Sequence, residues 1–374
     1  LAICGGVIGI LFMIPLRKFL IVKEHDNLPY PEGTASAEVL KAAAEGGSSA
    51  KNVFWGLGLG GFYKSVISLV VLWTDKVQIS LPFIKKAVIG VSTTPALLGV
   101  GYILGRRIGL IMVGGGLISW VVIIPFIAYN FGDTPILEST LDYLKTKGLK
   151  DSITTIGQLS PKYIWEAYIR IIGAGAVAMA GIITVIKSIP TMIESLKIGV
   201  KELKKSANSL DEGKIRTDED MHLKYVLLGI CLVILLITFI PGIIGAHTFM
   251  MMRFFGALAI ALFAFCFVTV SSRIVGLIGV SSNPTSGMAI VTLLGTGIIF
   301  YLLGWNDLEG KITALTIGTI VCIAASIAGD ISQDLKTGFL LGATPKKQQI
   351  SELIGATGSA FFVCLSVYYL GKAY

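Results

Sequence analysis

The densest group of side chains that could carry chemistry lies late in the chain, in the decapeptide GDISQDLKTG at 329–338. Asp330 and Asp334 are four residues apart, so a helix would place both carboxylates on one face, with Lys336 nearby to offset part of their charge. Together with Gln333, these groups could take up a proton, coordinate a cation or bind a substrate ammonium group. A charged helix end at a membrane surface explains the same residues equally well. We therefore predict a coupling or gating cluster and keep the solvated helix end as the alternative.

Two other segments combine polar residues with prolines inside apolar sequence. In the first, Pro31 and Gly33 forbid a continuous helix, so we expect a non-helical turn over Tyr30 to Thr34. Thr34 can then cap a short helix that ends at Gly46. The second lies in the uncharged run 274–306, which as one helix would be about 50 Å long and exceed a bilayer core. Pro284 lies within this run, so we expect a broken or re-entrant helix with a non-helical turn over Ser281 to Gly287, and keep a simple proline kink as the alternative.

Other chemistries have weaker support. The glycine-rich stretch 56–61 lacks both a preceding strand and a following Lys-Ser/Thr, so helix packing explains it better than nucleotide binding does. The five Cys and three His show no ligand spacing, and we expect no metal site and no cofactor. The Asp330–Asp334 spacing resembles the diphosphate sites of intramembrane prenyltransferases, but a second such motif is missing. We therefore expect a protein that is not an enzyme, with a membrane-embedded transferase as the alternative class.

The elements that hold these groups must lie in lipid. Hydrophobic residues make up 54% of the 374 residues and charged residues only 14%, with a mean hydropathy of +0.79. A soluble domain is about a quarter charged. Uncharged runs such as 87–105, 108–132, 254–272 and 353–371 have the length that an α-helix needs to cross the hydrocarbon. We count about ten spans and predict an all-α, polytopic transmembrane helical bundle with broken or re-entrant helices, forming a single transporter domain over 1–374.

The distribution of charge predicts the orientation. The net charge of +8 comes from basic residues between spans, which indicates cytoplasmic loops rather than a nucleic-acid partner. Arg17, Arg106, the segment 187–224 and Lys346 would then face the cytoplasm, and the segment 133–162 would lie outside. Lys76, Lys85 and Lys86 would also fall outside, against the rule. Within 188–222, apolar and basic residues alternate at helical spacing, so we expect a cytoplasmic amphipathic basic loop against anionic lipid, or an ordinary linker helix. Because the chain opens inside an apolar run without Met, we expect a piece of a longer protein, incomplete at both ends.

Three motifs carry a resemblance that composition cannot supply. NLPYPEGTA at 27–35, GVSSNPTSG at 279–287 and the long stretch from Gly329 through LGATPKKQQ at 341–349 resemble signatures of the oligopeptide transporter family, in the family's order. The resemblance covers essentially the whole chain. It fits the bacterial and archaeal branch better than the related plant yellow stripe-like metal-chelate transporters.

The resemblance implies a multi-pass protein of the cytoplasmic membrane that imports short oligopeptides by proton-coupled secondary transport. Transport of metal–chelate complexes is the alternative within the family. The implied partners are a small peptide or metal-chelate substrate, protons and the lipid bilayer; the sequence does not determine the oligomeric state. The residues implied in substrate binding or gating are Tyr30, Pro31, Glu32, Gly33, Ser282, Asn283, Pro284 and Gly287. Those predicted for coupling or gating remain Asp330, Gln333, Asp334 and Lys336.

Overall fold

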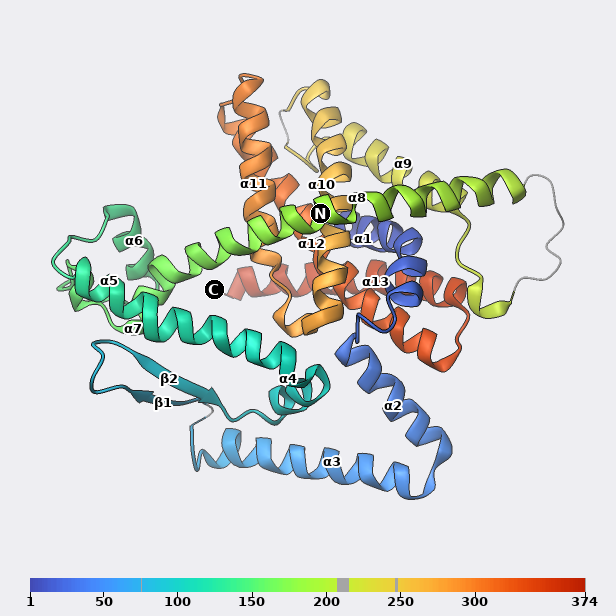
Figure 1. The fold of residues 1–374 in the computed structure, drawn as a ribbon. Helices are drawn as coiled ribbons and strands as arrows, with labels where there is room; N and C mark the ends of the chain where they lie inside the picture. The colour runs from blue at the N-terminus through green and yellow to red at the C-terminus, as the bar shows by residue number, and fades with distance from the viewer. Residues whose placement is uncertain (75, 207–214, 246–247, 374) are drawn as a thin grey trace. The chain divides into compact units, whose positions relative to one another are not determined.

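The fold is largely helical, as the sequence predicts (Figure 1). The computed structural model describes residues 1–74, 76–206, 215–245 and 248–373; for residues 49, 184–185, 188, 191–192, 194–206 and 373 it describes the backbone alone. Within these ranges, 9 helical segments are long and apolar enough to cross a membrane. They are Ala2–Lys23, Ala50–Val70, Pro95–Asn130, Pro161–Ile183, Arg216–Phe239, Met250–Ile278, Thr285–Leu302, Leu308–Leu341 and Pro345–Lys372.

The chain forms two compact units, and unit 2 is inserted within unit 1. Unit 1 comprises Leu1–Lys41 and Val177–Tyr374, and unit 2 comprises Ala42–Ala176. The helices that begin in unit 1 are α1 (Ala2–Arg17), continued by a π-helical turn (Lys18–Lys23), α2 (Pro31–Glu45), α9 (Leu223–Phe239), α10 (Met250–Ile278), α11 (Thr285–Leu302), α12 (Leu308–Leu341) and α13 (Pro345–Ala373). Helix α8 (Arg170–Ser206) carries the chain from unit 2 back into unit 1.

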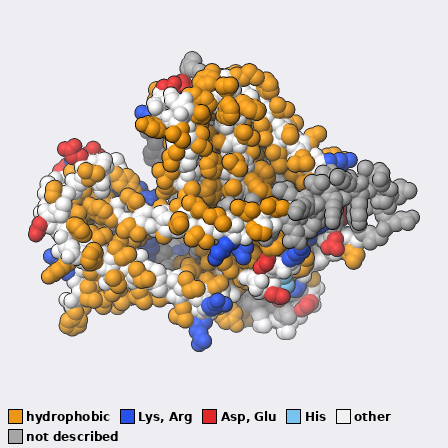
Figure 2. Space-filling model, turned by 45° about the horizontal axis from the view of Figure 1, so that its top comes forward, with side chains coloured by type: hydrophobic (Ala, Val, Ile, Leu, Met, Phe, Trp, Pro, Cys, Tyr) orange, Lys and Arg blue, Asp and Glu red, His pale blue; other side chains and the backbone are white. Residues whose placement is uncertain are grey.

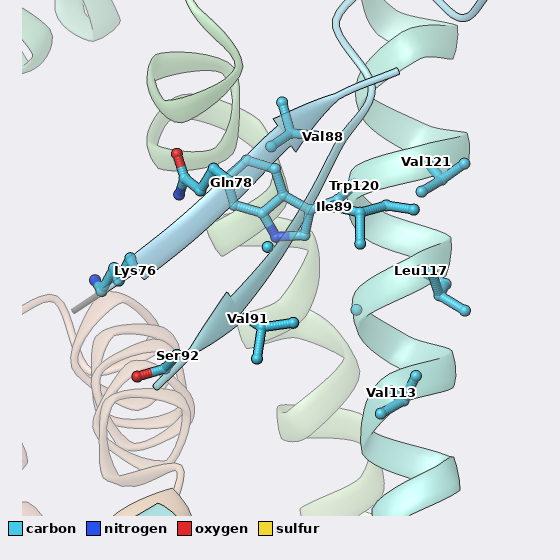
Figure 3. A pocket seen from close by; sticks show the side chains of 12 residues that line it. Lys76, Gln78, Val88, Ile89, Val91, Ser92, Val113, Leu117, Trp120 and Val121 are labelled. Carbon is cyan, nitrogen blue, oxygen red and sulfur yellow. The ribbon is translucent and has the colours of Figure 1, made fainter. Parts of the chain in front are cut away.

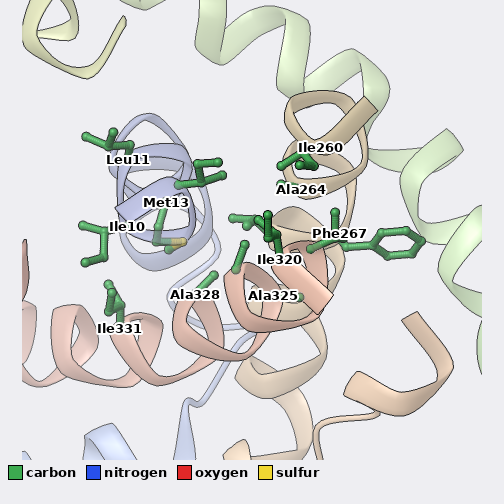
Figure 4. Packing of buried hydrophobic residues seen from close by; sticks show 14 of the residues in the cluster. Ile10, Leu11, Met13, Ile260, Ala264, Phe267, Ile320, Ala325, Ala328 and Ile331 are labelled. Atoms are coloured by element: carbon green, nitrogen blue, oxygen red, sulfur yellow. The ribbon is translucent and has the colours of Figure 1, made fainter. Parts of the chain in front are cut away.

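Helices α1, α10 and α12 form the core of unit 1. Figure 4 shows their apolar side chains meeting, with Met13 from α1, Ala264 from α10 and Ile320 from α12 among them. The backbones of α1 and α12 approach closely, because a Cβ added to Gly9 would lie only 2.5 Å from the Ala324 carbonyl oxygen. Small residues of this kind let helices pack closely in lipid, where the hydrophobic effect does not drive helix association.

Unit 2 contains shorter elements. It holds α3 (Gly47–Ser65), α4 (Pro95–Leu117), α5 (Ile124–Asn130), α6 (Glu138–Thr146), α7 (Pro161–Ile164) and π-helical turns at Val66–Val70, Ile118–Ile123 and Trp165–Ile169. It also holds an antiparallel hairpin of β1 (Lys76–Ser80) and β2 (Val88–Ser92), paired from Lys76–Ser92 to Ser80–Val88.

The hairpin corrects one sequence expectation. The run 87–105 is predicted as a span, yet its first residues form β2, and the helix starts only at Pro95. That helix continues past the predicted boundary at Arg106 to Asn130, interrupted at Gly105, where φ is +75°. The candidate segment Pro95–Asn130 therefore includes parts of both predicted spans, with the break at Gly105 between them, so 9 candidate segments are found among the described residues where about ten spans are expected.

The first predicted break lies where the prolines indicate, but its non-helical part is shorter than the sequence predicts. Tyr30 has a positive φ of 46°, and Pro31 is the first residue of α2, where its missing N–H costs nothing. The expectation that Tyr30 to Thr34 forms a non-helical turn is therefore wrong beyond Tyr30. Thr34 does not start the helix; its hydroxyl donates to the Pro29 carbonyl oxygen over 2.6 Å. The helix ends at Glu45, directly before Gly46, as predicted.

The second break also lies inside the apolar run that contains Pro284. Helix α10 ends at Ile278, Gly279 has φ +83°, and a 3-10 turn covers Val280–Ser282 before α11 begins at Thr285. Gly287, predicted in the turn, already lies in the first helical turn of α11. The broken helix expected from the length of 274–306 is confirmed.

The predicted basic loop at 188–222 lies partly outside the described residues. The backbone of its first part continues α8 to Ser206, and residues 207–214 and the side chains of 194–206 are not among those described. From residue 215 the chain forms a 3-10 turn (Arg216–Asp218) and then enters α9. The amphipathic interpretation therefore stays a prediction.

Hydrophobic side chains also cover much of the surface. Figure 2 shows them over much of the visible face, with Lys and Arg gathered in a few places. Phe361, Phe362, Tyr368 and Leu370 of α13 are each more than half exposed. Lipid accepts such apolar surface, whereas water does not.

Candidate functional site

The site begins at Tyr30, which is fully buried in unit 1. Its N–H donates to the Gly276 carbonyl oxygen over 2.9 Å, and its hydroxyl lies 3.5 Å from that of Ser272. The Ser272 hydroxyl lies 2.5 Å from that of Ser332, so three hydroxyl groups join the loop before α2 to α10 and α12. Only glycine fits at 276, because a Cβ there would lie 2.9 Å from the Tyr30 ring. Burial raises the pKa of Tyr30, and the phenol stays protonated.

Glu32 and Gln333 connect both chain breaks to α12. One carboxylate oxygen of Glu32 accepts from the Val280 N–H over 2.9 Å, and the other accepts from the Gln333 side-chain amide over 2.7 Å. Val280 follows Gly279 at the end of α10 and begins the 3-10 turn, so Glu32 satisfies a backbone donor that the break leaves without a helical partner. The start of α2, the break after α10 and α12 are therefore joined through one carboxylate.

Gly33 allows α2 to approach α12 closely. Its N–H donates to the Gln333 side-chain oxygen over 2.7 Å, and its carbonyl oxygen accepts from the Thr337 hydroxyl over 2.9 Å. A Cβ on Gly33 would lie 2.4 Å from the Gln333 backbone oxygen, so no larger residue fits without displacing one of the helices. Gln333, only 4% exposed, has both its amide oxygen and its amide nitrogen engaged here.

Lys336 contacts the loop before α2 rather than the two aspartates. Its Nζ lies 2.6 Å from the His25 ring nitrogen and donates to the Leu28 carbonyl oxygen over 3.1 Å. The expectation that Lys336 offsets the charge of Asp330 and Asp334 is wrong. Two residues beyond Asp334, a helix has turned by about 200°, and Lys336 is buried on the inner face of α12.

Asp330 and Asp334 lie on the outer face of α12 and are exposed within unit 1. No ion pair of either carboxylate occurs among the described residues. The backbone oxygen of Asp334 accepts from the Gln348 side chain of α13 over 2.5 Å. The four predicted coupling residues therefore divide into an inner pair in the site, Gln333 and Lys336, and an outer pair of acids.

Asn283 closes the other side of the site. Its amide nitrogen donates to the Ser271 hydroxyl over 2.9 Å, and Ser271 donates to the Ala325 carbonyl oxygen over 2.5 Å. The amide oxygen of Asn283 is buried without a hydrogen-bond partner among the described residues. Such an acceptor is costly to leave unused, so it is a candidate contact for a ligand donor. Ser282 and Pro284 flank it in the break, and Gly287 is buried in α11.

A second polar cluster joins three segments at one end of unit 1; we call it the polar clasp and define it as Arg17, Glu219, Asp220, Lys346 and Gln349. Arg17, 2% exposed, pairs with Asp220 over 3.2 Å. Gln349 donates to the other oxygen of Asp220 over 2.7 Å, and Lys346 pairs with Glu219 over 2.6 Å. The end of α1, the segment before α9 and the start of α13 therefore meet here.

Unit 2 carries an open pocket of about 460 Å³ between the hairpin and the helical segment that starts at Pro95. Figure 3 shows Val88, Val113, Leu117 and Trp120 around it, so the lining is mostly apolar.

Lys86, which is predicted outside against the positive-inside rule, has hydrogen-bond partners within this unit. Its Nζ donates to the backbone oxygens of Gly157 and Leu159, and burial, with adjacent Lys85, lowers the pKa of Lys86.

Several residues of the site were not predicted. Ser271 and Ser272 lie in an uncharged run, where hydroxyls blend with apolar residues, and His25 was set aside as a scattered histidine. Asp220 and Gln349 gave no local signal, because their partners lie more than 120 residues away. Arg17 at the end of a span gave the one available hint, since a buried arginine needs an acidic partner.

The helical spans, the two breaks within apolar sequence and the polar groups gathered between them define a multi-pass membrane protein of the transporter class. The chain belongs to the oligopeptide transporter family, whose model (OPT oligopeptide transporter protein) matches residues 1–374. Members of this family are transporters and not enzymes, which sets the transferase alternative aside.

Two relatives show the range of the family. A protein of Haemophilus influenzae, assigned provisionally as an oligopeptide transporter, is 31% identical over 388 residues, covering 99% of this chain and 58% of the relative. The iron-phytosiderophore transporter of rice (Oryza sativa subsp. japonica) is 22% identical over 379 residues, covering 95% of this chain and 51% of the relative. The chain thus spans little more than half the length of these relatives.

Proposed function

We propose that the protein is a secondary active importer that couples the uptake of short oligopeptides to protons across the cytoplasmic membrane. The observation that carries this proposal is the position of Glu32. Its carboxylate lies where both chain breaks meet α12, held by Val280 and Gln333. Transporters use such breaks to offer backbone groups and charges to a substrate near the middle of the membrane.

The chemistry of this site suits a peptide. Glu32 can receive a peptide ammonium group, and the buried Asn283 oxygen can receive a peptide N–H. The residues that we assign to substrate binding or gating are Tyr30, Pro31, Glu32, Gly33, Ser282, Asn283, Pro284 and Gly287. Tyr30 and Gly33 act by holding Glu32 in place through their contacts with α10 and α12, and Pro31 acts by starting the helix that carries Glu32.

We assign coupling or gating to Asp330, Gln333, Asp334 and Lys336. The inner pair holds two neighbouring segments against α12. Gln333 receives the Gly33 N–H from the first turn of α2, and Lys336 donates to the Leu28 carbonyl oxygen in the segment before α2. The outer pair provides carboxylates on the same helix. Movement of α12 would therefore change the substrate site and the surroundings of both acids together.

A second candidate function is the transport of metal–chelate complexes, because the rice relative is named as an iron-phytosiderophore transporter. The same site offers such a complex the Glu32 carboxylate and the buried Asn283 amide oxygen.

Uptake by the full-length protein in proteoliposomes separates the two candidates. Labelled tetrapeptide and labelled iron chelate are compared, each with and without an inward pH gradient. We expect concentrative tetrapeptide uptake only with the gradient. Uptake of the chelate alone would replace the peptide proposal by the second candidate, and uptake that ignores the pH gradient would exclude proton coupling.

A further inference from the structure

One carboxyl group of unit 1 is buried outside the site described above. Glu352 lies on α13 one turn after Gln349 and one turn before Ala356. Gln349, Glu352 and Ala356 lie along one face of α13, and this face packs inward. Gln349 is fully buried, and Leu353 and Ala356 pack against the core cluster of α1, α10 and α12. A Cβ on Gly6 of α1 would lie 3.7 Å from that of Ala356, so this face is in contact with α1.

Both carboxylate oxygens of Glu352 are buried, and neither has a hydrogen-bond partner among the described residues. An ionised carboxylate in that state would lose its hydration without compensation, which is among the most costly arrangements a protein can contain. A neutral carboxylic acid loses far less. In this conformation the group is therefore stable as the acid, with its proton enclosed.

The charges around Glu352 also favour the protonated acid. Helices α1 and α12 pack against α13, and the segment before α9 bonds to its first turns. The titratable groups of these elements include Cys4 and Arg17 of α1, Glu219 and Asp220 before α9, and Asp330, Asp334 and Lys336 of α12. Asp334 belongs to the part of α12 that Gln348 of α13 contacts, and a negative charge there disfavours a second one on Glu352. The two cations, Arg17 and Lys336, have partners other than Glu352. Arg17 pairs with Asp220, and Lys336 donates to the Leu28 carbonyl oxygen.

Glu352 is also connected to the substrate site by a short path. The Gln348 side chain, one helical turn earlier on α13, donates to the Asp334 backbone oxygen, and Asp334 follows Gln333 directly on α12. A shift of α12 that rearranges Gln333 and Glu32 would therefore also change what covers Glu352.

We propose that Glu352 is the carboxyl group that carries the coupled proton through the transport cycle, an inference that rests on the proposed function. The group holds the proton while α1, α12 and α13 enclose it. When the conformational change exposes it to the cytoplasm, the O–H bond breaks and the proton passes to water. The empty carrier regains a proton from the opposite side.

The test compares wild type, Glu352→Gln and the control Glu38→Gln in proteoliposomes of the full-length protein. Glu38 is an exposed acid of α2 paired only with Lys41 among the described residues. One pH unit can drive about tenfold accumulation per coupled proton, so wild type and the control should concentrate labelled tetrapeptide by that order. In Glu352→Gln, which mimics the permanently protonated acid, accumulation should fall to equilibration, whereas exchange of internal for external tetrapeptide should continue.

Each other outcome has a definite meaning. Wild type that does not respond to the pH gradient refutes the proposed function itself. A responsive wild type with a Glu352→Gln variant that still accumulates substrate refutes the role of Glu352. Loss of exchange as well as accumulation assigns Glu352 to binding or gating and also overturns the proposal.

A second measurement needs no variant and therefore stands even if Glu352→Gln does not fold. A hydrophobic carbodiimide adds to carboxylic acids that are protonated inside apolar surroundings. We expect it to label the wild-type peptide that contains Glu352 and to abolish gradient-driven accumulation. Full loss of accumulation without label at Glu352, or label without loss, would contradict the assignment.

Discussion

At the scale of single residues, the site depends on hydrogen bonds whose donors and acceptors are nearly all matched. Glu32 accepts from both Val280 and Gln333, and Gln333 in turn receives the Gly33 N–H. A buried network of this kind is sensitive to a change of one atom, because each lost partner leaves another group unsatisfied. Function should therefore fail before folding does.

The substitution Glu32→Gln tests this directly. The amide offers one acceptor where the carboxylate offers two, so either Val280 or Gln333 faces a second donor. We expect tetrapeptide uptake to be lost, with a decrease in stability of about 1–3 kcal/mol for the unsatisfied group. Uptake and thermal unfolding in detergent are the measurements, with Glu38→Gln on the same helix as the matched control. Unchanged uptake would remove Glu32 from the substrate site.

Asp330→Asn and Asp334→Asn address the outer acids. Both side chains are exposed on α12, so folding should be largely unaffected. If these acids take part in coupling, proton-driven uptake is lost while substrate exchange is retained; if they form a gate or bind substrate, both are lost. Normal uptake in both variants would show that the pair is only a solvated part of the helix.

At the scale of elements, the sequence predicts what depends on local geometry and misses what depends on distant contacts. Both helix breaks follow from proline and glycine, whose backbone limits act within a few residues. The hairpin was missed because Val88–Ser92 is too apolar to be separated from a span by composition. Glu352 was missed because one acid at the start of an apolar run looks like the membrane boundary, and only packing shows that it is enclosed.

The close contact of α1 with α12 gives a prediction with a control on the same helix. In Gly9→Ala the new methyl would lie 2.5 Å from the Ala324 backbone oxygen, which cannot move without shifting α12. We expect destabilisation of roughly 1–3 kcal/mol by overpacking. Gly6→Ala adds the same atom at an ordinary 3.7 Å from Ala356 and should be nearly neutral. Equal thermal stability of the two variants in detergent would show that the helices are not this close.

At the scale of the whole molecule, the polar clasp bears on the orientation predicted from basic residues. Arg17 meets Asp220, and Lys346 meets Glu219, so the end of α1, the segment before α9 and the start of α13 share one end of unit 1. The sequence predicted a common side for these segments from charge alone, while the acidic partners gave no signal. The pairs thus support one side for all three.

Accessibility labelling measures this common side. Single cysteines introduced at Ser206 and Thr344 should react with a membrane-impermeant reagent from the same side, which we expect to be the cytoplasm. A cysteine at Asp133, predicted outside, should react from the other side. Labelling of Ser206 and Thr344 from opposite faces would refute the shared orientation, and protection of Asp133 from outside would refute the sidedness of that loop.

The separation in sequence between Gly33 and Gln333 has a consequence for how the protein is made. Their hydrogen bond joins residues 300 positions apart. At a ribosomal rate of about 5–20 residues per second, α1 and the segment that follows it wait roughly 15–60 s in the bilayer before Gln333 of α12 is made. Arg17 and Tyr30 lack Asp220 and Ser272 for most of that interval, because these partners lie 203 and 242 residues further along the chain. The nascent chain therefore presents an unpaired arginine beside an apolar segment, the state that membrane quality-control proteases and chaperones are suited to detect.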